Sequence, residues 1–292
     1  MDNKTMLTLA IDIGGTKFAL AAFAGAQIIR RETRPTAREG GREWLLPQML
    51  QIARQWQRDL PFDRCGIAFG GPVDFPRQMI ARSMPVAGWG SFPISQFFGA
   101  ELGIPTIVDN DANVGALAEA ACGAGRGYDP LFYMTISTGI GGGIVSHGAL
   151  LRGANSLAGE IGHVPVMADG PECLCGSKGC LERLCSGLWL ERDHGRSARE
   201  LLQDPEFVRH HYVGYLAQGL RIVTMLLNPA RIVIGGGLSK AQDNLFVPLR
   251  EELARHLAPW PSAVADVVPS ALGDDNILHG ANVLAATIET KG

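Results

Sequence analysis

The sequence predicts an α/β protein with two lobes, mixed sheets and a cleft between the lobes. Strand-like apolar runs alternate with helical stretches, which is typical of layered helices and sheets. One layout also occurs twice, beginning near residues 7 and 131: an apolar strand, a glycine-rich turn that carries a threonine, and a returning strand. The returning strands make each sheet mixed rather than purely parallel. Two halves of related layout indicate a cleft between two lobes.

The individual elements follow from periodicity and from turn residues. In the first half we expect strands at 7–14, 18–25, 64–69 and 106–109 and helices near 42–58 and 112–121. In the second half we expect a hairpin whose first strand is 131–137, and a long amphipathic helix at 209–227 that ends at an Asn-Pro pair. We also expect a buried strand at 231–239 that opens onto glycines.

The division into lobes follows from length and layout. The 292 residues exceed the roughly 100 to 200 residues usual for one domain. We expect a small N-terminal lobe of residues 1–117, joined by a C-terminal helix at about 280–292, and a large lobe of residues 118–279.

Composition and charge place the chain among ordinary globular proteins. Apolar residues make up 46%, charged residues 19%, and the formal net charge is -3. Arginines at 30–42 are interleaved with glutamates, which indicates a solvated face rather than a nucleic-acid patch. The N-terminus lacks a leader pattern, and no apolar run reaches membrane-spanning length. We therefore expect a cytoplasmic protein with neither nucleic acid nor membrane as a partner.

Three glycine-rich turns are candidates for phosphate binding. The first follows Asp12 and holds Gly14, Gly15 and Thr16, and the second holds Thr138 with Gly139 to Gly143. The third spans 235–237. Glycine lets backbone N–H groups approach a phosphate closely, although any one of these segments can be a simple tight turn. Three such segments, two of them in matched positions, favour phosphate binding, while both common nucleotide-binding motifs are absent from the sequence.

A polar segment, VDNDAN, joins an apolar strand to a helix. Helix capping explains one of Asp109, Asn110 and Asp111 but does not require all three. A carboxylate at the mouth of a cleft is what phosphoryl transfer needs to orient and deprotonate its nucleophile.

One histidine and three cysteines form a candidate metal site. His163, Cys173, Cys175 and Cys180 offer nitrogen and sulfur ligands within 18 residues, a set that suits tetrahedral zinc. Free thiols are the alternative, since the spacing differs from the common finger pattern. With four protein ligands the zinc would be structural rather than catalytic.

The other cysteines have simpler interpretations. Cys185 belongs to a predicted helix, and Cys65 and Cys122 lie in apolar runs that indicate buried core thiols. The metal site would fix the carboxylates that flank it, Glu160 and Glu182.

These motifs together resemble those of the ROK sugar kinases. The segments DIGGTK, GGPVD, VDNDAN, STGIGGG, GEIGH, CLCGSKGCLE and IGGGL occur in the order of that family, over about residues 7–284. The resemblance implies the actin-like ATPase (ribonuclease H-like) fold, with two lobes that close on ATP and a hexose, and it implies a homodimer.

The resemblance also implies a role for each motif. Asp111 is the expected general base for the sugar 6-hydroxyl, and the expected sugar-ring contacts are Asn110, Glu160, His163, Glu182 and the backbone of Gly71. The expected phosphate contacts are Gly14, Gly15, Thr16, Thr138 and Gly139. Gly236 and Gly237 match the nucleoside site, Asp12 matches the position that places Mg²⁺, and Lys17 fits the motif without an assigned role.

The sequence departs from the family pattern at two places. Pro85 and Val86 stand where many members carry a sugar-contacting Asn before a Trp, which weakens glucose as the substrate, and Gly70 stands where a Pro is frequent.

The leading hypothesis is a glucokinase, with a kinase of N-acetylmannosamine or another hexose as the alternative. Transcriptional regulators of this family carry a DNA-binding segment of several dozen residues ahead of the kinase-like part, whereas here the first strand begins near residue 7. A sugar-binding relic without turnover is the third possibility.

Overall fold

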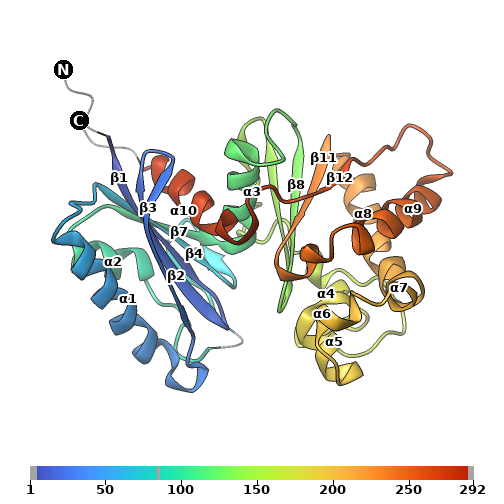
Figure 1. Cartoon of the computed structure of the whole chain (residues 1–292), viewed down its shortest axis with the longest axis horizontal. Helices are drawn as coiled ribbons and strands as arrows, with labels where there is room; N and C mark the ends of the chain where they lie inside the picture. The colour runs from blue at the N-terminus through green and yellow to red at the C-terminus, as the bar shows by residue number, and fades with distance from the viewer. Residues whose placement is uncertain (1–4, 84–85, 289–292) are drawn as a thin grey trace. The chain divides into compact units, whose positions relative to one another are not determined.

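The chain folds into two compact units in the computed structural model, which describes residues 5–83 and 86–288. Unit 1 takes the described residues up to 118, the short segment 153–157, and the residues from 277 onward. Unit 2 takes residues 119–152 and 158–276. Each unit is built around one five-stranded sheet (Figure 1).

The two sheets have the same topology. Unit 1 has the strand order β3-β2-β1-β4-β7 and unit 2 the order β10-β9-β8-β11-β12. In each sheet an antiparallel hairpin is followed by two parallel strands, β1 with β4 and β7 in one and β8 with β11 and β12 in the other. The mixed sheets and the duplicated layout predicted from the sequence are thereby confirmed.

The strands of unit 1 are β1 (Leu7–Ile13), β2 (Lys17–Ala24), β3 (Gln27–Pro35), β4 (Arg64–Phe69) and β7 (Thr106–Asn110), with a small ribbon of β5 (Val73–Asp74) and β6 (Met79–Ile80). The strands of unit 2 are β8 (Leu131–Ile136), β9 (Ile140–Ser146), β10 (Ala149–Leu150), β11 (Arg231–Gly235) and β12 (Val267–Pro269).

Helices cover both faces of the unit 1 sheet, because β1 and β4 are apolar on both sides. Leu9 and Ile11 share a core with α1 (Gly41–Gln57) and α2 (Ile94–Leu102). Small residues on the other side, such as Ala10 and Ala68, pack against α3 (Asp111–Cys122) and α10 (Asn276–Ala286). Gly280 of α10 comes so close to the carbonyl of Val114 that a Cβ would overlap it. The glycine therefore permits α3 and α10 to approach.

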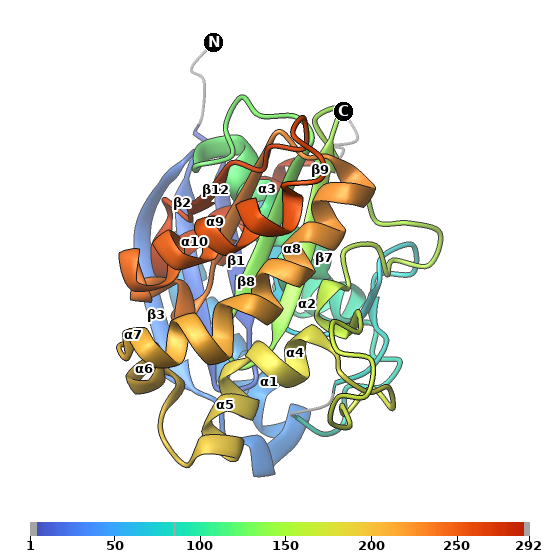
Figure 2. The ribbon, with the colours of Figure 1, turned by 90° about the vertical axis from the view of Figure 1, so that its right-hand side faces the viewer.

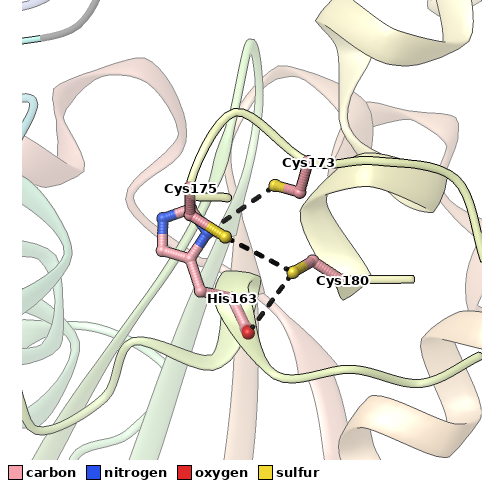
Figure 3. A group of neighbouring side chains, drawn as sticks. All are labelled: His163, Cys173, Cys175 and Cys180. Atoms are coloured by element: carbon pink, nitrogen blue, oxygen red, sulfur yellow. Dashed lines mark hydrogen bonds between the residues drawn. The ribbon is translucent and has the colours of Figure 1, made fainter. Parts of the chain in front are cut away.

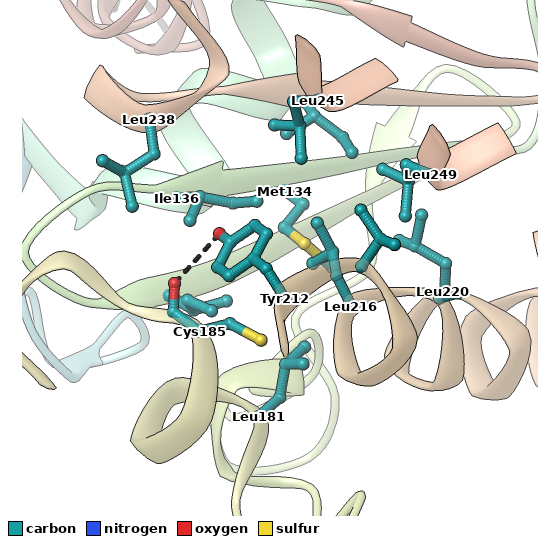
Figure 4. Close-up of a cluster of buried hydrophobic side chains, with 14 of the residues drawn as sticks. Met134, Ile136, Leu181, Cys185, Tyr212, Leu216, Leu220, Leu238, Leu245 and Leu249 are labelled. Carbon is teal, nitrogen blue, oxygen red and sulfur yellow. Dashed lines mark hydrogen bonds between the residues drawn. The ribbon is translucent and has the colours of Figure 1, made fainter. Parts of the chain in front are cut away.

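The core of unit 2 lies between its sheet and a layer of helices (Figures 2 and 4). Met134 and Ile136 of β8 pack with Leu216 and Leu220 of α8 (Val213–Leu227) and with Leu249 of α9 (Asp243–Leu257). The remaining helices of this unit are α4 (Leu181–Cys185), α5 (Gly187–His194), α6 (Ala198–Leu201) and α7 (Pro205–Phe207).

Two expectations about local structure were wrong. The predicted helix at 209–227 is confirmed over 213–227, the range of α8, and is wrong only in its first turn, where the π-helical turn Val208–Tyr212 replaces α-helix. This turn buries Tyr212, whose hydroxyl donates to the carbonyl of Cys185 at 3.0 Å (Figure 4). Cys122 is exposed rather than buried, because it lies in the last turn of α3, whereas Cys65 is buried as expected.

A buried carboxylate fixes both ends of unit 2. Glu119 and Asn276 are its first and last residues, and the Asn276 side chain donates to Glu119 at 2.7 Å. The hydroxyl of Ser270 and the amide of Ala124 donate to the same carboxylate. Among residues 5–83 and 86–288, no helix is long and apolar enough to cross a membrane.

Candidate functional site

The predicted base and the first phosphate loop lie at one edge of the unit 1 sheet. Strands β1, β4 and β7 are parallel neighbours, so their carboxyl ends meet at this edge, where ligands of open α/β sheets usually bind. The ends carry Asp12, Gly70 and Asp111. A Cβ at position 70 would lie 3.5 Å from Asp111 Oδ2 and 3.7 Å from the Cα of Gly14. The three strand ends are therefore in direct contact around Gly70.

The three polar residues before α3 have three different roles. Asp109 is 1% exposed and accepts hydrogen bonds from Asn113 Nδ2 at 3.0 Å and from the amide of Asn110 at 2.7 Å. The Asn110 oxygen caps the helix by accepting from the amides of Ala112 and Asn113. Asp111 is half-buried and begins the helix, and its Oδ1 accepts a hydrogen bond from the amide of Ala112 at 2.8 Å.

Gly71 and Asn110 are held together. Asn110 Nδ2 donates to the carbonyl of Gly71 at 3.1 Å, so the tip of β4 orients the amide at the tip of β7. An amide nitrogen carries two hydrogens, and the second can reach a ligand. Pro85 lies outside the described residues, and Val86 is 4% exposed within the core of unit 1.

The first loop, residues 14–16, is a three-residue hairpin turn between β1 and β2. The amide of Gly14 donates to the carbonyl of Lys17 at 3.0 Å, and a Cβ at position 14 would lie 2.9 Å from that same oxygen. Thr36 Oγ1 donates to the Gly14 carbonyl at 3.1 Å, and Arg38 Nε donates to the Gly15 carbonyl at 2.6 Å. Residues beyond β3 thus fix the carbonyl side of this loop.

Asp12 lies just before the first loop. Burial raises the pKa of its carboxyl to about 6, and the positive charge of Lys17 opposes that rise. A bound cation would favour the ionised form further, which suits a group that places Mg²⁺.

The second loop, residues 137–139, has the same length between β8 and β9. The amide of Ser137 donates to the carbonyl of Gly139 at 2.9 Å. The amides of Gly187 and Leu188, at the start of α5, donate to the carbonyls of Ser137 and Thr138 at 2.8 and 3.2 Å. Thr138 is exposed, as Thr16 is in the first loop.

The glycines after the second loop serve packing rather than the turn. The sequence interpretation extended the loop to Gly143, but β9 begins at Ile140, so that expectation was too long. Gly142 meets Gly159 so closely that a Cβ on either would overlap the other's carbonyl, and Gly162 meets the carbonyl of Ile140 in the same way. These contacts seat the 3₁₀ turn Ile161–His163 directly on β9.

The four predicted metal ligands converge (Figure 3). One ligand atom from each of His163, Cys173, Cys175 and Cys180 lies within 4.8 Å of all the others. Cys175 Sγ is 3.6 Å from Cys180 Sγ, and Cys173 Sγ is 4.0 Å from His163 Nδ1. Ligand atoms around a tetrahedral zinc are separated by about 3.8 Å when the metal–sulfur distance is about 2.3 Å. The cluster therefore has the dimensions of a zinc site.

The pKa values of two of the thiols shift in opposite directions. Burial, together with the two neighbouring thiols, raises the pKa of Cys180 to about 12. Burial acts on Cys175 in the same direction, but hydrogen bonds from the Ser177 backbone and the Cys180 and Cys173 side chains outweigh it and lower the pKa of Cys175. A cation at the centre would favour the thiolate at all three positions.

The two carboxylates predicted to flank the metal site are close to His163 and to each other. Burial raises the pKa of Glu160, the His163 ring opposes that rise, and the charge of Glu182 adds to it. Because His163 turns Nδ1 toward the cysteines, its Nε2 is the nitrogen that can face a ligand. Glu182 Oε2 accepts a hydrogen bond from the amide of Ile140 at 2.8 Å, an interaction that the sequence did not predict.

A surface pocket of about 290 Å³ adjoins the third glycine segment. It is lined by Arg199, Leu202, Gln203, Gly237, Leu238, Lys240 and Ala241. Gly236 has a positive φ of 86°, and a Cβ there would overlap the carbonyl of Ile136, so this turn requires glycine. Arg199 and Gln203 lie about 35 residues before the glycines, and no sequence pattern points to them.

Comparisons with known proteins agree with this geometry. The model of the ROK family matches residues 8–288. The chain belongs to the ROK family. A glucokinase of Thermotoga maritima is 30% identical, with 96% of this chain and 98% of the relative covered. An N-acetylmannosamine kinase of Escherichia coli O157:H7 is 31% identical, with 96% and 98% covered.

A solved structure supports the same assignment. The ROK family glucokinase of Streptomyces griseus, in complex with glucose and AMPPNP, matches with a TM-score of 0.83 and 27% identity. The match covers 96% of this chain and 99% of that one. The present chain accordingly has the two-lobed actin-like ATPase fold that the sequence predicted.

Within each unit, the ROK motifs converge as follows. Unit 1 brings together Asp12, Gly14, Gly71, Asn110 and Asp111 at one sheet edge. Unit 2 brings together the second loop, Glu160, His163, Glu182 and the three cysteines. The side chain of Lys17 is exposed.

Proposed function

We propose that this protein is an ATP-dependent sugar kinase that transfers the γ-phosphoryl group to the 6-hydroxyl of a hexose. The observation that carries the proposal is the position of Asp111, half-buried at the start of α3 beside Gly70 and the first loop. Family membership and the glucokinase relatives support the same reaction.

Asp111 is proposed as the general base. Its carboxylate orients the 6-hydroxyl and takes the proton as the sugar oxygen forms a bond to the γ-phosphorus and the bond to ADP breaks. The reaction needs little covalent chemistry from the protein and depends on positioning and on charge neutralisation. The neighbouring Asp109 and Asn110 support Asp111, because they fix the first turn of its helix.

The two glycine loops are proposed to bind the phosphates of ATP. Each loop exposes a threonine, Thr16 or Thr138, next to backbone amides that glycine leaves accessible. Asp12 is proposed to place the Mg²⁺ that accompanies ATP, and the cation would neutralise charge on the phosphates. The pocket beside Gly237 is proposed for the nucleoside, and Arg199, Gln203 and Lys240 would line it.

The sugar ring is proposed to contact Asn110, Glu160, His163 and Glu182, with a backbone contact from Gly71. Carboxylates accept hydrogen bonds from sugar hydroxyls, and a His163 ring whose Nδ1 faces a metal would donate from Nε2.

His163, Cys173, Cys175 and Cys180 are proposed to hold a structural Zn²⁺. The donor set and its spacing fit tetrahedral zinc, and four protein ligands leave no position for a substrate. The metal would fix the segment between the turn of His163 and helix α4, which carries Glu182.

Glucose is the leading substrate and N-acetylmannosamine the second candidate. Glucokinase relatives favour glucose. The N-acetylmannosamine kinase relative favours the second, and Pro85 and Val86, at the positions where many members carry a sugar-contacting Asn, weaken the case for glucose. We further propose that the protein acts as a homodimer in the cytoplasm, with neither nucleic acid nor membrane as a partner.

A coupled assay of ADP release tests the proposal. Purified protein with ATP, Mg²⁺ and each of glucose, mannose, N-acetylmannosamine, N-acetylglucosamine, allose and fructose should release ADP with one sugar strongly preferred. ADP release that no sugar stimulates would contradict a sugar kinase. A preference for N-acetylmannosamine over glucose would keep the kinase and replace the leading substrate.

A further inference from the structure

We propose that Glu182 is a positioning residue for the second phosphate loop, in addition to any contact with the sugar. This inference rests on the proposed function and deepens it. It gives one carboxylate a role in nucleotide binding that the motif alone does not indicate.

The contact between Glu182 and the loop is direct. Glu182 Oε2 accepts from the amide of Ile140 at 2.8 Å, and Ile140 is the first residue of β9. A Cβ added at Gly139 would lie 2.7 Å from the same oxygen. Because Ile140 is only 4% exposed, its amide needs a partner from the protein. The carboxylate supplies that partner and packs against the loop at the same point.

Helix α4 holds Glu182 rigidly in this place. The helix is five residues long, and its first residue, Leu181, is fully buried against Gly219 of α8. At its other end the carbonyl of Cys185 accepts the Tyr212 hydroxyl, and the amide of Ser186 donates to the carbonyl of Glu182. The backbone beneath the carboxylate is therefore fixed from both sides.

Residues 182–188 form hydrogen bonds with the second loop and the residue after it at three points. Besides the Glu182 bond, the amides of Gly187 and Leu188 donate to the carbonyls of Ser137 and Thr138. The two amides of α5 fix the carbonyls of the loop, and Glu182 fixes the amide that follows it. Removal of the carboxylate would release one side of the loop and leave the other side attached.

The geometry divides the work between the two carboxylate oxygens. Oε2 already accepts from Ile140, which leaves Oε1 as the oxygen with both lone pairs open to a sugar hydroxyl. A sugar on Oε1 would restrict the side chain that holds the loop and so favour nucleotide binding. By linkage, the nucleotide would favour sugar binding by the same factor.

Glu160 is the matched control. It is a half-buried carboxylate of the same proposed sugar site, and its electrostatic partners are His163 and Glu182. We expect its truncation to weaken sugar binding without weakening nucleotide binding in the absence of sugar.

The test measures the affinity for AMPPNP with Mg²⁺ by calorimetry, without sugar, on protein that retains its zinc. Glu182→Ala should weaken binding by about 10-fold, the effect of one lost hydrogen bond to a charged group. Glu182→Gln should bind within about 2-fold of wild type, because an amide oxygen still accepts from Ile140. Glu160→Ala should bind like wild type.

A double-mutant cycle supplies a readout that general destabilisation does not move. Gly139→Ala should weaken AMPPNP binding in the wild-type background, because the new Cβ displaces the carboxylate. In the Glu182→Ala background the same change should have little further effect. This cycle also serves if Glu182→Ala alone folds poorly, since Glu182→Gln can replace it as the second background, where the new Cβ should still weaken binding.

Each outcome is decisive. Wild-type affinity in Glu182→Ala, or additive effects in the cycle with Glu182→Ala, would overturn the positioning role, and so would loss of the Gly139→Ala effect in the Glu182→Gln background. Failure of the wild-type protein itself to bind AMPPNP would instead overturn the proposed function.

Discussion

The first and second loops occupy matched places in the two units but are held in different ways. Each is a three-residue turn that follows the central strand of a sheet of the same topology. The penultimate residue of that strand is Asp12 in β1 and Thr135 in β8. The first loop thus has a carboxylate in its own strand, whereas the second takes one, Glu182, from helix α4. The difference indicates that the shared topology specifies the turn but not which part of the chain supplies its carboxylate.

The hydrogen bonds that hold the two loops also come from different parts of the chain. Side chains just beyond β3, Thr36 and Arg38, fix the first loop. Backbone amides of α5 and the Glu182 carboxylate fix the second, about 45 to 50 residues along the chain. The second loop therefore depends on α4 and α5, which come after Cys180 in the chain, and the first does not.

The largest expected effect separates Asp111, the proposed base, from Glu182, the proposed positioning carboxylate. Asp111→Asn should lower kcat by about 10²- to 10⁴-fold, because the proton acceptor is lost while the shape is kept. Sugar affinity measured by calorimetry should change little. A variant with the kcat of wild type would reject Asp111 as the base.

The metal site should affect only the second loop. Cys175→Ser should lower zinc content and reduce the free energy of unfolding by about 2 to 4 kcal/mol, because a metal site forms only in the folded chain. Hydrogen exchange should rise at residues 137–140 and stay unchanged at 14–16. Faster exchange in both loops, or full activity in a variant without metal, would argue against a structural role confined to unit 2.

Matched glycine substitutions test the contacts that hold each of the two loops. Gly14→Ala should destabilise the protein by about 1 to 3 kcal/mol, because the new Cβ meets the backbone carbonyl of Lys17, which cannot move aside. Gly139→Ala should cost less stability, because its Cβ meets the end of the Glu182 side chain. Urea unfolding of both variants measures the difference, and the reverse order would contradict it.

The smallest effect concerns pH and the first loop alone. Burial raises the pKa of Asp12 from 3.8 to about 6, so the folded protein holds this proton more tightly than the unfolded chain. The contribution of Asp12 to stability is therefore complete below about pH 4 and is lost as pH rises through 6. The free energy of unfolding of Asp12→Asn, relative to that of wild type, should rise by about 1 to 3 kcal/mol between pH 4 and 7 in Mg²⁺-free buffer. A pH-independent difference in urea unfolding would contradict a buried, protonated Asp12.

The sequence predicted the features that depend on local pattern. Strand periodicity and turn glycines located both loops, and the spacing of Cys173, Cys175 and Cys180 located the metal cluster, because neighbouring residues decide these structures. Features that depend on long-range packing were missed. The bond from Ile140 to Glu182 joins residues 42 apart, and it requires the observed placement of α4 on β9.

Other misses have the same physical cause. Gly142 was expected to belong to the second loop, but its close approach to Gly159 is what requires it. Cys122 lies in an apolar run, yet its place in the last turn of α3 exposes it. The pocket beside Gly237 is built from helix α6 and a distant glycine turn, which no short pattern connects.

The most direct test of the account is the product formed from ATP and the preferred hexose, measured by phosphorus NMR with the 6-deoxy form of that sugar as the control. The account predicts a hexose 6-phosphate from the sugar, no phosphorylated product from its 6-deoxy form, and no more than trace product from Asp111→Asn. A phosphorylated 6-deoxy sugar, or an Asp111→Asn variant that forms hexose 6-phosphate at the wild-type rate, would contradict it.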